Sequence, residues 1–177
     1  MSVKDFVQQR RDDFISMRRD FHMYPEPAWL EYRSAAKVAE KLIALGYDVA
    51  LGAEVLDLDS RMGLPSEDVM KAAMARAMDE GADPELVEKM GYGKTAIVAT
   101  MKFSDDGPVV AFRADMDSND VIESKASNHI PAKAGFRSRH EKAMHACGHD
   151  THMTMGLGLA EYIATHKDGL KGTIKLI

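Results

Sequence analysis

The stretch from Pro108 to Ile177 constrains the fold most, because it combines two apolar strands with a helix between them. Residues 109–112 are continuously apolar, which is typical of a strand covered on both faces. Apolar residues recur at helical spacing from Thr151 to His166, and residues 171–177 form a last strand. This order of elements predicts a domain of the α/β class.

A further predicted strand lies upstream, from Lys94 to Met101. The sequence Ser104-Asp-Asp-Gly107 follows it and has turn composition, so we expect the strands on either side to pair as a hairpin. The hairpin and the strand–loop–helix–strand unit together predict a mixed sheet flanked by helices. In such sheets, ligands gather beyond the carboxyl ends of the strands.

Helices are predicted on both sides of a proline-containing connector at residues 22–31. The first begins with a capping-box-like Ser2 and continues to about Phe21. The second runs from Tyr32 to about Leu45, where a glycine ends it.

Residues 54–92 are predicted to be a helical insertion between strands. Three methionines lie four residues apart on it, at Met70, Met74 and Met78. We interpret them as an apolar face packed on the body of the domain rather than as a metal-binding methionine box.

Length and charge limit the classes of function. A chain of 177 residues is long enough for one domain with a substantial core. The net charge of −5 and the absence of a basic stripe exclude a nucleic-acid binder. No apolar run is long enough to span a bilayer, and the first residues lack the apolar core of a secretory signal. A single cysteine cannot form an internal disulfide, so we expect a cytoplasmic protein.

The chemistry of the chain concentrates at residues 144–152, Met-His-Ala-Cys-Gly-His-Asp-Thr-His. Cys147 and His149 are two residues apart, and Gly148 between them lets the backbone bend. A thiolate and an imidazole together suit Zn²⁺ and its neighbours better than Mg²⁺ or Ca²⁺. Asp150 stands where we expect the N-cap of the following helix. The sequence therefore predicts a metal-binding loop, with a small buried cysteine as the simpler alternative.

Two acids, Asp115 and Asp117, follow the strand at residues 109–112, at the edge where we expect the cysteine cluster to lie. The simpler interpretation is solvation of a strand end. Between them and the cluster runs a long loop without periodicity, residues 118–146, and long loops inside compact domains are usually functional or mobile.

Five motifs, taken together, resemble the M20 metallopeptidase and amidohydrolase family in its cysteine-containing branch. They are His22-x-x-Pro25-Glu26, Arg113-Ala-Asp-Met-Asp117, His129-x-Pro131, Gly135-Phe136-x-Ser138 and Met144-His-Ala-Cys-Gly-His-Asp150. The resemblance implies a three-layer α/β/α, zinc-exopeptidase-like catalytic domain with a mixed sheet. It also implies metal-dependent hydrolysis of the amide bond of an N-acyl amino acid, aminobenzoyl or similar, or of a dipeptide.

The resemblance assigns roles to particular residues. It implies that Cys147 and His149 are metal ligands and that Asp117 orients a ligand or bound water. It also implies that a few further residues line the same pocket, namely His145, Asp150 and His152. The cofactor implied is Zn or Mn, with one or two ions in the complete enzyme.

The same resemblance places several parts after the last strand. These are a paired-Glu motif that supplies the general base, further histidine ligands and a dimerisation domain. We therefore expect residues 1–177 to be an incomplete, truncated catalytic domain that alone binds metal weakly and hydrolyses little. The complete enzyme is expected to be a homo-oligomer or to have a partner subunit.

Two alternatives remain open on the sequence alone. In one, Cys147 is a nucleophile activated by His145 or His149, as in thiol hydrolases. In the other, the chain is a non-catalytic assembly module whose unpaired last strand recruits a partner by edge pairing.

Overall fold

A computed structural model describes all 177 residues. Its helices are α1 (Val3–Gln9), α2 (Arg11–Met23), α3 (Tyr32–Ala44), α4 (Glu67–Asp79), α5 (Pro84–Lys89), α6 (Ile130–Lys133) and α7 (His149–Thr165). Its strands are β1 (Asp48–Leu51), β2 (Ile97–Lys102), β3 (Val109–Phe112) and β4 (Thr173–Leu176), and two short 3₁₀ turns, η1 (Gly52–Glu54) and η2 (Leu58–Ser60), follow β1. No helix combines the length and apolar character needed to cross a membrane.

The four strands form one mixed sheet in the order β1-β2-β4-β3. β4 pairs antiparallel with β2, where Ala99 lies opposite Leu176, and parallel with β3, where Phe112 lies opposite the same residue. The predicted hairpin between β2 and β3 is therefore wrong. The later strand β4 separates them, because the backbone of Gly172 accepts a hydrogen bond from Phe103 N–H (2.9 Å) and Pro108 accepts one from Thr173 N–H (2.9 Å).

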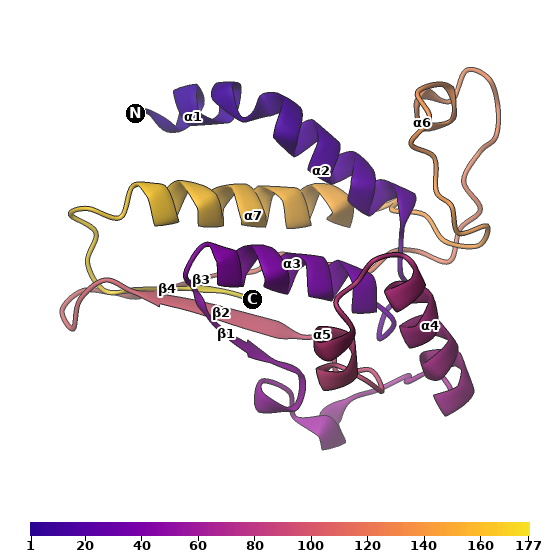
Figure 1. Ribbon diagram of the computed structural model, residues 1–177, viewed down its shortest axis with the longest axis horizontal. Coiled ribbons are helices and arrows are strands. Elements are labelled where there is room, and N and C mark those ends of the chain that lie inside the picture. Colours follow the sequence, from indigo (N-terminus) through magenta and orange to yellow (C-terminus); the bar gives the residue numbers. More distant parts are fainter.

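The helices α1, α2, α3 and α7 lie over one face of the sheet (Figure 1). The predicted mixed sheet with helices packed on it is confirmed, and the second helical layer of the expected three-layer arrangement stays a prediction. The expectation that residues 109–112 are covered on both faces is wrong. β3 is an edge strand, and Val109 and Val110 are 69% and 53% exposed.

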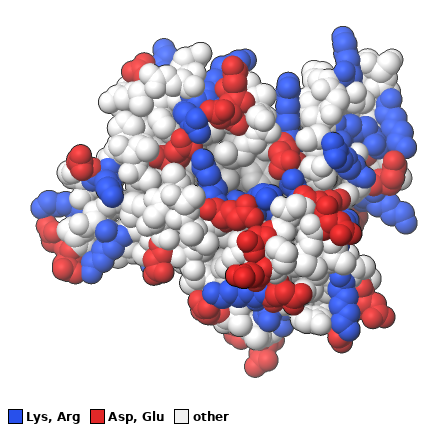
Figure 2. Space-filling view, viewed as in Figure 1, with Lys and Arg blue, Asp and Glu red and all other residues white.

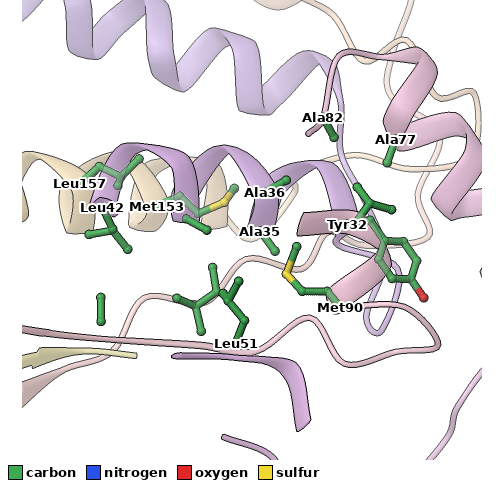
Figure 3. Close-up of a cluster of buried hydrophobic side chains, with 14 of the residues drawn as sticks. Tyr32, Ala35, Ala36, Leu42, Leu51, Ala77, Ala82, Met90, Met153 and Leu157 are labelled. Atoms are coloured by element: carbon green, nitrogen blue, oxygen red, sulfur yellow. The ribbon is translucent and has the colours of Figure 1, made fainter. Parts of the chain in front are cut away.

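Small residues let the helices pack closely on one another and on the sheet. Ala35, Ala36 and Ala39 of α3 are fully buried. Figure 3 shows side chains of both α3 and α7 on the same side of the strands, in one buried cluster. On α7, a Cβ at Gly156 would lie 3.2 Å from the side chain of Ala114, and one at Gly158 would lie 3.3 Å from the Phe14 ring. The lack of a side chain at these two glycines therefore allows the close approach of α7 to its neighbours.

Most helix boundaries follow the sequence signals. The predicted first helix is instead two helices that meet at Arg10, whose Nε lies 2.8 Å from Glu161 of α7. Gly46, with φ of +83°, ends α3 as expected. In the 54–92 segment, Met70 and Met74 are buried, so the methionine face packs on the core as predicted.

Candidate metal centre

His149 is the first residue of α7, and its ring is fixed by the segment that leaves β3. Its Nδ1 lies 2.8 Å from the backbone carbonyl oxygen of Asp117 and 3.0 Å from Oδ1 of the same residue. Two acceptors at Nδ1 favour the tautomer that carries its proton there, which leaves the Nε2 lone pair free. An acid behind a histidine in this way is the usual outer-shell partner of a metal-binding imidazole.

Three side chains present donor atoms to a common point: Asp115, His149 and His152. One atom from each lies within 4.8 Å of the others. The two imidazole rings are stacked, with centroids 5.1 Å apart. Asp115 is also paired with Arg113, at 2.5 Å, and a guanidinium at that distance competes with a cation for the carboxylate.

Cys147 lies on the turn immediately before α7 and is exposed. Its N–H donates to Oδ1 of Asn119 (3.1 Å), and Asn119 exchanges two backbone hydrogen bonds with Met144, both 3.0 Å. Gly148 then turns the chain with φ of +84°, a conformation that side-chain-bearing residues rarely adopt. Cys147 is not among the three converging donors, so its role as a ligand remains a prediction.

His145 is buried, and neither of its ring nitrogens has a hydrogen-bond partner. Burial lowers the pKa of this imidazole to about 4. The Cys147 thiol forms no hydrogen bond with His145, and the Nδ1 of His149 is engaged by Asp117. The geometry therefore lacks the thiol–imidazole pair that the thiol-hydrolase alternative requires.

Asp150 is fully buried and points away from the three converging donors, into the protein. Its Oδ2 lies 2.8 Å from His22 Nδ1 and 2.9 Å from Arg18 Nε, and its Oδ1 accepts a hydrogen bond from Thr151 N–H (2.8 Å). The predicted N-cap position is wrong, because Gly148 is the N-cap and Asp150 is the second residue of the helix. His152, by contrast, is exposed, with Nδ1 3.8 Å from Asp115.

The loop at residues 118–146 has more structure than its sequence predicts. It contains the short helix α6, and buried Glu123 holds its interior together. It also carries five basic residues, Lys125, Lys133, Arg137, Arg139 and Lys142. In Figure 2, Lys and Arg side chains gather on the part of the molecule where Figure 1 shows α6.

A second buried acid, Glu26, ties the connector after α2 to α3 and to the segment beyond Asp117. Its carboxylate accepts hydrogen bonds from the N–H groups of Arg33 (3.0 Å) and Ser34 (2.7 Å), and its carbonyl oxygen accepts one from Ser118 N–H (2.8 Å). Burial raises the pKa of Glu26 to about 7 against the opposing effect of these hydrogen bonds. Burial likewise raises the pKa of Glu31 to about 7.

These raised values predict that stability falls as the pH rises from about 4.5 to about 7. In that window the folded state retains a proton that the unfolded state has lost, so each pH increment favours unfolding. A rise from 4.5 to about 7 corresponds to roughly 3 kcal/mol per group. Urea unfolding across this range should show the decline. Glu26→Gln should reduce the decline by about half, because Glu31 still contributes, while Glu67→Gln, at an exposed position, should leave it unchanged. An equal slope in wild type and Glu26→Gln would contradict the assignment.

Comparison with known proteins shows which proteins the chain is similar to. Residues 111–177 match the model of peptidase family M20/M25/M40. The chain is a relative of the M20 peptidases. It is 43% identical over 175 residues to the indole-3-acetyl-aspartic acid hydrolase of Enterobacter agglomerans, covering 99% of this chain and 40% of that protein. It is 45% identical over 176 residues to a subunit of the p-aminobenzoyl-glutamate hydrolase of Escherichia coli, with the same two coverages.

Solved structures of M20 relatives share the fold. An aminobenzoyl-glutamate utilization protein from Klebsiella pneumoniae matches with a TM-score of 0.80 and 35% identity, over 99% of this chain and 38% of that one. A dinuclear metal-binding M20 peptidase from Bacillus subtilis matches with a TM-score of 0.61 and 25% identity, over 98% and 35%. The chain thus spans about 40% of the length of the curated M20 relatives.

Sequence reasoning and structure agree on part of this candidate site. The structure brings His149 and Asp117 into direct contact and places His152 beside them. It adds Asp115, which the sequence identified only as a strand-end acid. It also reveals buried contacts of His22 with Glu123 and Asp150, to which no sequence signal pointed beyond the presence of His22 in a quoted motif.

Proposed function

We propose that this chain supplies part of the metal centre of a divalent-metal-dependent amidohydrolase that acts on N-acyl amino acids. The observation that carries the proposal is the fixed His149 ring, whose Nδ1 is held by Asp117 and whose Nε2 is free. Support for the metal comes from the M20 match and from a dinuclear metal-binding relative. Support for the substrate class comes from the names of the two hydrolases described above.

The residues present fit a divalent cation of the zinc group. His149 would bind through Nε2, and Cys147, two residues earlier and exposed, would provide a thiolate from the same turn. Asp117 would orient the imidazole, as outer-shell acids do. Asp115 suits a neighbouring position less well while Arg113 holds its carboxylate, and His152 is available beside His149. Zn²⁺ and Mn²⁺ are the candidate ions.

A bound ion of this kind lowers the pKa of a coordinated water toward about 7 and polarises an amide carbonyl. The residues of this chain then have three tasks. Cys147 and His149 would hold the ion, Asp117 would keep the proton of His149 on Nδ1, and the turn at Gly148 would carry the two ligands on one short segment. Two protein ligands are fewer than the three that catalytic zinc sites use, so we expect weak metal binding and little turnover by the 177 residues alone.

Metal analysis of the purified chain tests the proposal. We expect wild type to bind Zn²⁺ or Mn²⁺, and Cys147→Ser and His149→Ala to lower the affinity by more than the ~10–100-fold that is typical when a partner of a ligand is removed. His166→Ala is the matched control, because this histidine lies at the far end of α7. Equal metal content in wild type and Cys147→Ser would show that the cysteine is not a ligand. Turnover of p-aminobenzoyl-glutamate by wild type at the rate of a complete hydrolase would overturn the expectation of an incomplete site.

A non-catalytic assembly module receives no support from the strand arrangement. The strand expected to recruit a partner, β4, is paired on both sides by β2 and β3.

A further inference from the structure

His22, near the end of α2, joins two buried carboxylates that lie on different segments of the chain. Its Nδ1 is 2.8 Å from Oδ2 of Asp150, and its Nε2 is 3.0 Å from Oε1 of Glu123. The side chain of His22 is 3% exposed, and both carboxylates are completely buried. The imidazole therefore connects the first turn of α7 with the loop at residues 118–146.

An imidazole with a carboxylate at each nitrogen donates from both and is therefore an imidazolium. Burial lowers the pKa of His22, but the hydrogen bonds to Asp150 and Glu123 outweigh it and leave the pKa raised. The network extends outward from the ring, because the Arg18 guanidinium lies 2.9 Å from Asp150 and His129 Nε2 lies 2.8 Å from Glu123. Such a network holds its members in one arrangement.

The position of Asp150 makes this arrangement relevant to the candidate metal centre. Asp150 follows His149 directly, and both belong to the first turn of α7. Fixing the Asp150 carboxylate therefore fixes the rotation of the turn that carries the His149 ring. On the other side, Glu123 accepts a hydrogen bond from Ser138 N–H (2.5 Å), so the same imidazole is anchored to the folded loop.

We propose that His22 is a positioning residue for the metal centre, acting on His149 through the carboxylate of Asp150. The inference depends on the proposed function, because it requires Cys147 and His149 to bind an ion. His22 itself touches neither of the two proposed ligands.

Two amide substitutions separate the two hydrogen bonds of His22. The amide nitrogen of Asn occupies the place of Nδ1 and can still donate to Asp150, whereas the amide nitrogen of Gln occupies the place of Nε2 and reaches Glu123. We expect His22→Gln to weaken Co²⁺ binding by about tenfold, the lower end of the effect of direct partners of metal ligands, and to alter the visible absorption of the Co²⁺-loaded protein. His22→Asn should stay within about threefold of wild type, since it retains the bond to Asp150.

A comparable histidine provides the matched control. His140 also bonds through both nitrogens, with Nδ1 2.7 Å from the carbonyl oxygen of Pro25 and Nε2 2.8 Å from Glu80, but it has no bond to α7. His140→Gln should lower the melting temperature without changing Co²⁺ affinity. A purely structural role for His22 predicts instead that the Asn and Gln variants shift melting temperature and Co²⁺ affinity equally, and that result would overturn the inference.

The outcomes distinguish this inference from the function on which it depends. If wild type binds Co²⁺ and Cys147→Ser does not, but His22→Gln binds as wild type does, only the positioning role fails. If wild type binds no Co²⁺, both fail. If circular dichroism shows that both His22 variants are unfolded, the Asp150→Asn variant tests the inference instead. It removes the charge to which His22 bonds while keeping the shape of the side chain at position 150. Wild-type affinity in that variant would overturn the inference.

Discussion

Gly172→Ala is expected to lower the free energy of unfolding by about 4 kcal/mol, because two separate costs combine at this position. Gly172 has φ of +79°, which costs an alanine about 1–2 kcal/mol. An added Cβ would also overlap the carbonyl oxygen of Pro108 and would lie 2.9 Å from the carbonyl carbon of Gly107. The Pro108 oxygen accepts the hydrogen bond from Thr173 N–H that begins the β3–β4 pair, so relief of the overlap separates these strands.

Gly169→Ala isolates the backbone cost. Gly169 has φ of +85°, but nothing lies within 4 Å of the position that its Cβ would take. We therefore expect a loss of only about 1 kcal/mol for Gly169→Ala in urea unfolding. Equal losses for the two variants would mean that the β3–β4 junction is looser than the structure describes.

Glu123→Ala is expected to cost about 3–5 kcal/mol, which is the usual effect of removing one partner from a buried charged network. The carboxylate bonds to His22 (3.0 Å), His129 (2.8 Å) and the N–H of Ser138 (2.5 Å). Its removal leaves the imidazolium of His22 buried against one acid and leaves a buried backbone donor without an acceptor. The imidazolium and the backbone N–H stay buried away from water, but the hydrogen bonds to Glu123 that offset the cost of their desolvation are lost.

Glu141→Ala provides the comparison within the same loop. Glu141 pairs with Lys125 at 3.1 Å, and both side chains are 66% exposed. Surface pairs of this kind contribute about 0–1 kcal/mol, so the free energy of unfolding of Glu141→Ala in urea should differ little from that of wild type. If Glu123→Ala is as mild as Glu141→Ala, the buried network is not formed in solution.

Local signals predicted the helices well, and the pairing of strands poorly. The glycine at the end of α3, the capping residue Ser2 and the spaced methionines of α4 act within a few residues, so the sequence shows them directly. Strand pairing depends on distant partners. The turn composition after β2 predicts a hairpin, but β4, about seventy residues later, satisfies the hydrogen bonds of both β2 and β3. The turn is therefore present without the hairpin.

The candidate site likewise contains residues that a local sequence pattern predicts and contacts that no local pattern predicts. Cys147 and His149 are neighbours in sequence, so their spacing alone indicates metal chemistry. The acid behind His149 could be expected because it ends a strand that leads to the same edge of the sheet. The contacts of His22 with Asp150 and Glu123 span 128 and 101 residues, and no local pattern marks them.

The central place of β4 has a consequence for biosynthesis. β2 ends at Lys102 and β4 begins at Thr173, so residues 103–172 emerge between them. At roughly 5–20 residues per second, a ribosome needs several seconds for that stretch. Until β4 emerges, the edge of β2 that faces β4 in the folded sheet has no strand to pair with, and neither has β3. Unpaired strand edges promote wrong association of nascent chains. β2 and β3 therefore become part of one sheet only after β4 has emerged, because β4 pairs with both of them.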